Sequence, residues 1–249
     1  MSRKCWKKRA RYCVSLWLSM VLASPSMAQD GLIVIGAPIP PTILDAPHEQ
    51  GVYFDLFKLI AEQIPGLQLK FDMVPPGRVR WSLEHMQAPL IILAPSFASV
   101  PGNMRLLAPV WSGGHLVLLY RKALAQSFVS QRRMVGRTNA LCAQLPQQVR
   151  NIDVYELNSS EQGMRMLDHQ RLDAVCQPDF EIGYYLRRHN SNWSHYAPPR
   201  PIAKISWSIY VNSQVSAAEG ARIQRAIQTL REDGRLKQLF GRFEAEFQP

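Results

Sequence analysis

Cysteine is scarce in this sequence, and its spacing matches no metal site. Four cysteines occur in 249 residues, without the short paired spacing that zinc motifs use. The histidines are scattered too, and none forms a helical metal-binding pair: His48, His85, His115, His169, His189 and His195. We therefore expect no metal and no cofactor, and we interpret the histidines as surface residues.

The sequence also lacks a pattern typical of catalysis. A general acid or base must be positioned beside the reacting group. We find no paired carboxylates and no nucleophile constellation, only the isolated Asp179. The sequence thus favours a binding protein over an enzyme, with no catalytic residue.

The apolar segment near the N-terminus is too short to cross a membrane. Residues 14–24 are about half the length of a membrane-spanning helix. Six basic residues and no acidic one precede them within positions 1–12, and small residues follow at Ser26 and Ala28. This pattern predicts a signal peptide over residues 1–28, cleaved before Gln29, and hence a soluble periplasmic protein.

Removing the predicted signal peptide changes the charge balance. The full chain has a formal net charge of +10, whereas residues 29–249 carry 23 basic against 19 acidic residues, a net charge of +4. A nucleic-acid-binding domain usually has a strongly basic face. We therefore expect no nucleic-acid partner.

Two cysteines remain in the predicted mature chain. Cys142 and Cys176 would lie in an oxidising compartment, where disulfides persist. We predict a disulfide between them, and two buried free thiols are the alternative. A bridge over this length of chain stabilises by about 4 kcal/mol in the chain-entropy model.

Strand and helix patterns alternate along the rest of the chain. We predict strands at 32–35, 67–73, 90–93, 116–120, 134–137, 154–157, 172–176 and 205–211 and helices at 51–64, 79–86, 141–149, after Ser159, after Pro178, 223–230 and 236–243. Residues 94–122 are rich in proline and glycine, and we interpret their middle as a long ordered connection between strands. This α/β order predicts mainly parallel sheets, whose ligands bind beyond the carboxyl ends of the strands.

Four segments in register resemble one family. They are residues 51–61 (GVYFDLFKLIA), 78–86, 170–174 (QRLDA) and 233–239 (DGRLKQL). The sequence resembles the periplasmic, or extracellular, solute-binding proteins of family 3, the type II receptors of ABC transporters. The resemblance implies an α/β two-lobed fold, each lobe a mainly parallel sheet flanked by helices, with two hinge crossings. Lobe 1 would be discontinuous, 29–119 plus 205–249, and lobe 2 would be 120–204.

The sequence departs from this family at the amino-acid clamp. Amino-acid binders of the family have a threonine-x-x-arginine segment after the third strand, and its arginine binds the ligand carboxylate through paired hydrogen bonds. Residues 98–101 (ASVP) occupy that place here. Arg105 follows four residues later, and it either reaches back to the ligand or is an exposed or structural arginine.

The resemblance also suggests which residues contact the solute. Asp179 pairs with a ligand amino group or is a first-turn carboxylate stabilised by the helix dipole. Arg137 and Thr138 precede a helix start that binds an anion or is an ordinary cap. For the aromatic candidates, core packing is the alternative to ligand stacking. The full set of candidates is Tyr53, Ser96, Phe97, Arg105, Trp111, Arg137, Thr138 and Asp179.

The expected function is capture of a small polar solute between the lobes, for an ABC importer, at a diverged amino-acid site. One alternative is a sensory or accessory periplasmic subunit without a transport role. Another is an enzyme like the periplasmic dehydratases that resemble these receptors. We expect a monomer that binds a small-molecule solute and works with an inner-membrane permease or sensor.

Overall fold

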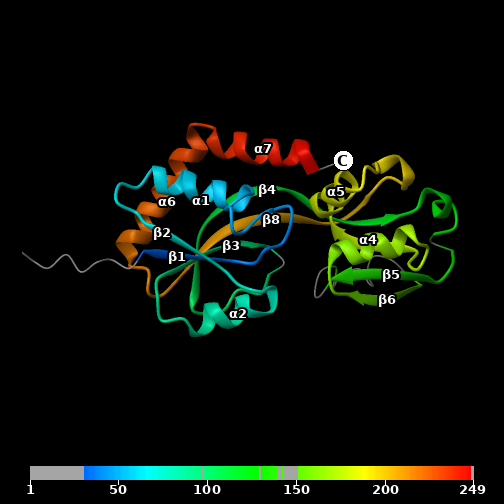
Figure 1. Cartoon of the computed structure of the whole chain (residues 1–249), viewed down its shortest axis with the longest axis horizontal. Coiled ribbons are helices and arrows are strands. Elements are labelled where there is room, and N and C mark those ends of the chain that lie inside the picture. The colour runs from blue at the N-terminus through cyan, green and yellow to red at the C-terminus, as the bar shows by residue number, and fades with distance from the viewer. Residues whose placement is uncertain (1–30, 97, 129, 139–141, 143–150, 248–249) are drawn as a thin grey trace, which may run out of the picture. The chain divides into compact units, whose positions relative to one another are not determined.

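A computed structural model describes residues 31–96, 98–128, 130–138, 142 and 151–247 (Figure 1). The strands are β1 (Leu32–Gly36), β2 (Leu69–Met73), β3 (Leu90–Pro95), β4 (Met104–Tyr120), β5 (Arg133–Thr138), β6 (Ile152–Leu157), β7 (Ala174–Pro178) and β8 (Arg200–Asn212). The helices are α1 (Val52–Glu62), α2 (Pro76–His85), α4 (Ser160–Asp168), α5 (Asp179–Arg188), α6 (Ala217–Glu232) and α7 (Arg235–Phe247), with short 3-10 turns η1 (Lys122–Leu124) and η2 (Trp193–His195). The predicted helix at 141–149 lies outside the described residues, apart from position 142. No helix of the described part has both the length and the apolar character needed to cross a membrane.

All eight strands form one sheet in the order β2-β1-β3-β8-β4-β7-β5-β6. The outer pairs at both ends are parallel: β1 with β2 and β3, and β5 with β6 and β7. The central pairs, β3 with β8, β8 with β4, and β4 with β7, are antiparallel. Two parallel β-α-β units are therefore joined through the long strands β4 and β8.

Helices bury the apolar faces of the sheet. In Figure 1, α1, α6 and α7 lie on one side of β1, β3 and β8, and α2 lies on the other. The first side holds much of the largest apolar cluster, including Phe54, Phe57, Ile209 and Ile227. The α2 side holds a smaller cluster around Leu83. A third cluster, which includes Met164, packs α4 and α5 against β4 and β7.

The sequence patterns predict most elements but miss the first 12 of the 17 residues of β4. Residues 104–115 belong to this 17-residue strand, so interpreting them as a connection was wrong. Pro109, Gly113 and Gly114 suggested a loop, but they lie where the register of β4 with β8 shifts. Bulges tolerate proline and glycine within a strand because the ladder of hydrogen bonds is already interrupted there.

Candidate functional site

The carboxyl ends of strands from both parallel units meet one stretch of β4 and β8. Pro95, at the end of β3, pairs with Trp207 of β8. Pro178, at the end of β7, pairs with Leu116 of β4. Between these points β4 pairs with β8, from Trp111 opposite Trp207 to His115 opposite Lys204. We call residues 111–115 and 204–207 the central ribbon, and this is the place where α/β sheets bind ligands.

Ser96 attaches the end of β3 to the central ribbon. Its main-chain N–H donates to the carbonyl of Ser206 at 2.8 Å. Its hydroxyl accepts from the N–H of Ser206 at 3.2 Å, and the residue is exposed. Ser96 is therefore a polar residue held at the ribbon by two hydrogen bonds to the main chain of Ser206. Phe97, the next candidate, lies outside the described residues.

Asp179 attaches the start of α5 to the same ribbon. Its carboxylate accepts from the N–H of His115 at 3.1 Å and from the N–H of Phe180 at 2.8 Å. The Nδ1 atom of His115 lies 3.5 Å from its Oδ2. Asp179 is 4% exposed, and burial raises the pKa of its carboxyl, against the effect of these donors. The carboxylate is thus occupied by protein donors.

A lysine and a histidine of the ribbon did not stand out in the sequence. Lys204 is exposed and lies directly opposite His115, whose side chain is 38% exposed. From the sequence we predicted that His115 is a surface residue, and we predicted no role for Lys204. No local motif marks them, because strand register brings together two positions about 90 residues apart. In the sequence, Lys204 is the polar residue directly before the alternating apolar residues Ile205 and Trp207. That position was the signal that could have marked it.

Arg137 and Thr138 lie at the end of β5, where neighbouring protein groups surround both side chains. The guanidinium of Arg137 contacts Oε1 of Glu156 on β6, from Nε at 2.9 Å and from Nη2 at 2.8 Å. Thr138 is buried. The helix start predicted to follow lies outside the described residues, so its amides stay a prediction. The predicted disulfide between Cys142 and Cys176 is confirmed.

Tyr53 and Trp111 are core residues. The hydroxyl of Tyr53 donates to the carbonyl of Ile35, and burial raises the pKa of this phenol. Trp111 packs in an aromatic cluster from β4, β8, α5 and α7, formed by Trp111, Trp207, Phe180, Phe240 and Phe243. Both rings therefore contribute to packing beside the ribbon, in line with the core alternative.

Arg105 lies away from the central ribbon. It pairs with Val211, near the end of β8. Its Nη2 atom is 3.4 Å from the carbonyls of both Val215 and Ser216, before α6. The structure thus brings Ser96 and Asp179 to the ribbon but holds Arg105 at the opposite end of β3, beside the start of α6.

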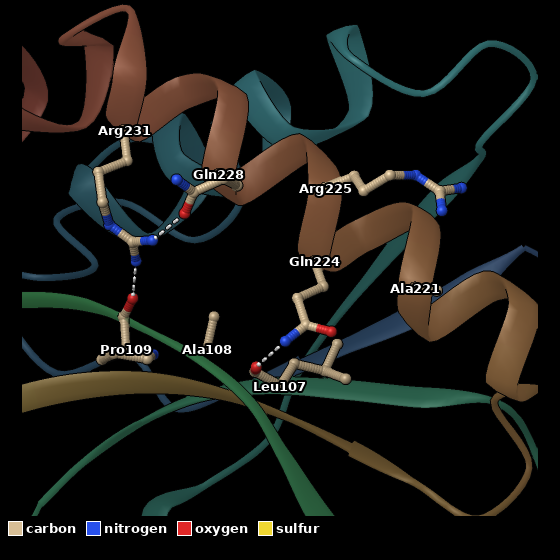
Figure 2. A pocket seen from close by; sticks show the side chains of 8 residues that line it. All are labelled: Leu107, Ala108, Pro109, Ala221, Gln224, Arg225, Gln228 and Arg231. Atoms are coloured by element: carbon tan, nitrogen blue, oxygen red, sulfur yellow. Dashed lines mark hydrogen bonds between the residues drawn. The ribbon is translucent and has the colours of Figure 1, made fainter.

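A groove of about 500 Å³ between β4 and α6 is a different feature (Figure 2). Within it, Gln224 donates to the carbonyl of Leu107 at 3.2 Å, and Arg231 donates to the carbonyl of Pro109 at 2.5 Å. These α6 side chains bind main-chain acceptors along β4, whereas Arg225 points away in Figure 2. None of the candidate solute-binding residues that the structure describes lines this groove.

Comparison with known proteins supports the fold. No family model and no curated protein matches the sequence. Among solved structures, the GluR0 ligand-binding core from Nostoc punctiforme, in complex with L-glutamate, is 19% identical with a TM-score of 0.66, covering 88% of this chain and 100% of that one. The substrate-binding protein of an amino acid ABC transporter is 14% identical with a TM-score of 0.63, at 86% and 99% coverage. A histidine kinase sensor domain similar to periplasmic binding proteins is 15% identical with a TM-score of 0.68, at 89% and 99% coverage.

These likenesses extend over nearly the full length of the solved structures. At such identities they establish a shared fold and no shared ligand. The chain has the two-lobed periplasmic-binding-protein type II fold, as the resemblance to solute-binding proteins of family 3 predicts.

Proposed function

We propose that this protein is a periplasmic receptor that captures a small polar solute at the central ribbon. The observation that carries this proposal is the convergence of the carboxyl ends of β3 and β7 on that ribbon. Loops from both parallel units can reach a solute there. We propose Ser96 and Thr138 as solute contacts from the two units, with Phe97 beside Ser96.

We further propose that the solute is delivered to an ABC importer and that the amino-acid site has diverged. One solved structure of this fold is the substrate-binding protein of an amino acid ABC transporter. Residues 98–101 lack the threonine and arginine of the amino-acid clamp, and Arg105 binds carbonyls before α6. This divergence also favours a second candidate, a sensory subunit, since another solved structure is a kinase sensor domain.

Binding without catalysis is the better proposal for the ribbon. A general base needs a carboxylate or imidazole that can reach a substrate proton. The carboxylate of Asp179 already accepts from two main-chain N–H groups, and within the described residues no serine, threonine or cysteine side chain is hydrogen-bonded to the imidazole of His115. The predicted signal peptide, the lobe boundaries and the monomeric state remain predictions that accompany this proposal.

A thermal-shift screen of residues 29–249 tests the proposal. A solute at a hundred times its dissociation constant stabilises the folded state by about 2.7 kcal/mol. We expect at least one member of a panel of amino acids, organic acids and amines to raise Tm. Failure of every compound, confirmed by calorimetry, would contradict the receptor function.

Matched serine variants then locate the site. Ser96→Val places two methyl groups at the ribbon and should weaken binding of the stabilising compound. Ser213→Val changes an exposed serine in the turn after β8 and should leave binding unchanged. Equal binding by both variants would remove Ser96 from the proposed site.

A further inference from the structure

The central ribbon presents a lysine and a histidine side chain on one face. Lys204 and His115 are direct partners in the antiparallel pair of β8 and β4. Directly opposed residues of antiparallel strands project to the same side of the sheet. Ser206 follows two residues after Lys204 and therefore shares this face. Since Ser206 is bonded to Ser96, the cationic face adjoins the end of β3.

Lys204 differs from Arg137 and Arg105 because its charged group has no protein partner among the residues that the structure describes. Within the described part of the chain, the side-chain ammonium of Lys204 has no hydrogen bond and no ion pair. By contrast, Arg137 is paired with Glu156, and Arg105 is bonded to carbonyls before α6. Of these three basic residues, the unpaired one is on the ribbon.

The carboxylate of Asp179, next to His115, does not make the charge of this face negative. Asp179 is almost fully buried and accepts from two main-chain N–H groups. It also lies 3.5 Å from Nδ1 of His115, and a neutral imidazole with its proton on that nitrogen has only an acceptor at Nε2. A solute amino group would have to displace these donors, whereas an anion meets the exposed ammonium of Lys204 directly.

We propose that the ammonium of Lys204, beside the imidazole of His115, binds a carboxylate group of the solute, in place of the arginine clamp that this chain lacks. The inference rests on the proposed receptor function and names the class of its solute. An ammonium is a compact point charge, which suits a single carboxylate without requiring the planar geometry of a guanidinium. The hydroxyl of Ser96, bonded to the N–H of Ser206, is a further polar group at this end of the ribbon.

Calorimetry with residues 29–249 and three probes tests this assignment: succinate and L-glutamate as carboxylates, and putrescine as an amine without a carboxylate. We expect binding of at least one carboxylate probe and none of putrescine. Lys204→Ala should weaken carboxylate binding about tenfold or more, as loss of a charged hydrogen bond does. His115→Gln keeps a polar side chain and should weaken binding less.

Lys70→Ala is the matched control, because Lys70 is an exposed lysine on the outer strand β2. It should leave binding unchanged, and circular dichroism should show that all three variants are folded. Equal carboxylate affinity in Lys204→Ala and wild type overturns the carboxylate assignment but leaves the receptor function standing. Binding of putrescine alone overturns it as well. If no probe binds and the wider solute panel also fails, the receptor function itself is contradicted.

Discussion

The indole nitrogen of Trp111 donates a 2.6 Å hydrogen bond to Oε1 of Glu244. This bond joins the central strand β4 to the C-terminal helix α7. Trp111 is buried, with 8% of its surface exposed, and its bond to Glu244 is partly buried. The indole therefore depends on Glu244 for its polar partner, while its ring depends on the aromatic cluster.

Removing this acceptor should destabilise the protein. A buried donor left unsatisfied costs about 1–3 kcal/mol, and we expect that loss in the unfolding free energy of Glu244→Ala. Glu244→Gln keeps an acceptor oxygen and should lose less. Urea denaturation measures both, with Glu246→Ala as control, since its exposed ion pair with Arg187 contributes about 0–1 kcal/mol. Equal losses for Glu244→Ala and Glu246→Ala would contradict this role.

Helices α5 and α7 approach so closely that one glycine is required. A Cβ atom at Gly183 would overlap the main-chain carbonyl of Phe247, so Gly183→Ala should force the helices apart and lower Tm. Gly241, also within α7, has open space around its Cβ position. Gly241→Ala should stabilise by up to about 1 kcal/mol through helix propensity. Calorimetric melting of both variants measures these two changes in stability. A Gly183→Ala protein as stable as wild type would contradict the close packing.

Reduction of the disulfide should lower stability. Cys142 and Cys176 are both buried and are 34 positions apart, and a loop of this length corresponds to about 4 kcal/mol in the chain-entropy model. We expect urea midpoints of the wild type to fall when a phosphine reductant is added. The double variant Cys142→Ala/Cys176→Ala should be insensitive to the reductant. A shift in the double variant would mean that the reductant acts elsewhere.

Glu181 should make stability depend on pH. Burial raises the pKa of its carboxyl from 4.5 to about 7, although the hydroxyl of Ser160 donates to it and lowers the pKa. The folded state therefore holds a proton that the unfolded state loses near pH 4.5. This contribution is fully present below pH 4.5 and is lost as the pH rises to about 7, by up to about 3 kcal/mol.

The Glu181→Gln variant isolates this contribution. The amide keeps an acceptor for Ser160 but does not ionise, so the variant should be more stable than wild type at pH 8 and similar at pH 4.5. Melting temperatures from pH 4.5 to 8 measure the difference. Glu62→Gln is the control, because the carboxylate of Glu62 is 61% exposed. Parallel pH profiles for wild type and Glu181→Gln would refute the assignment.

Local signals in the sequence predicted most of the fold. The helix predicted after Ser159 is confirmed as α4, and the hydroxyl of Ser159 caps it by accepting from the N–H of Gln162 at 3.1 Å. Gly234 ends α6 with a positive φ of 80°, as glycine allows. Such signals depend on residues a few positions apart, so they can be read without knowing the tertiary structure.

The candidate site was harder to predict because it depends on strand register. Asp179 was correctly placed at a helix start, but its contact with His115 joins residues 64 positions apart. The position of Lys204 opposite His115 needs the bulged register of β4 with β8. Residues that suggested a loop, such as Gly113 and Gly114, create that register. These two glycines thus predicted a loop at the position of the strand that carries the site.

The place of β8 in the sheet restricts the order in which this chain can fold. β8 starts at Arg200, yet it lies between β3 and β4, which end at Pro95 and Tyr120. A growing chain that lacks β8 leaves unpaired backbone on both earlier strands, and such edges are prone to aggregate. These non-local pairings also make folding slow. Completion of the sheet therefore waits for the last fifth of the polypeptide, which leaves the earlier part available to chaperones during synthesis.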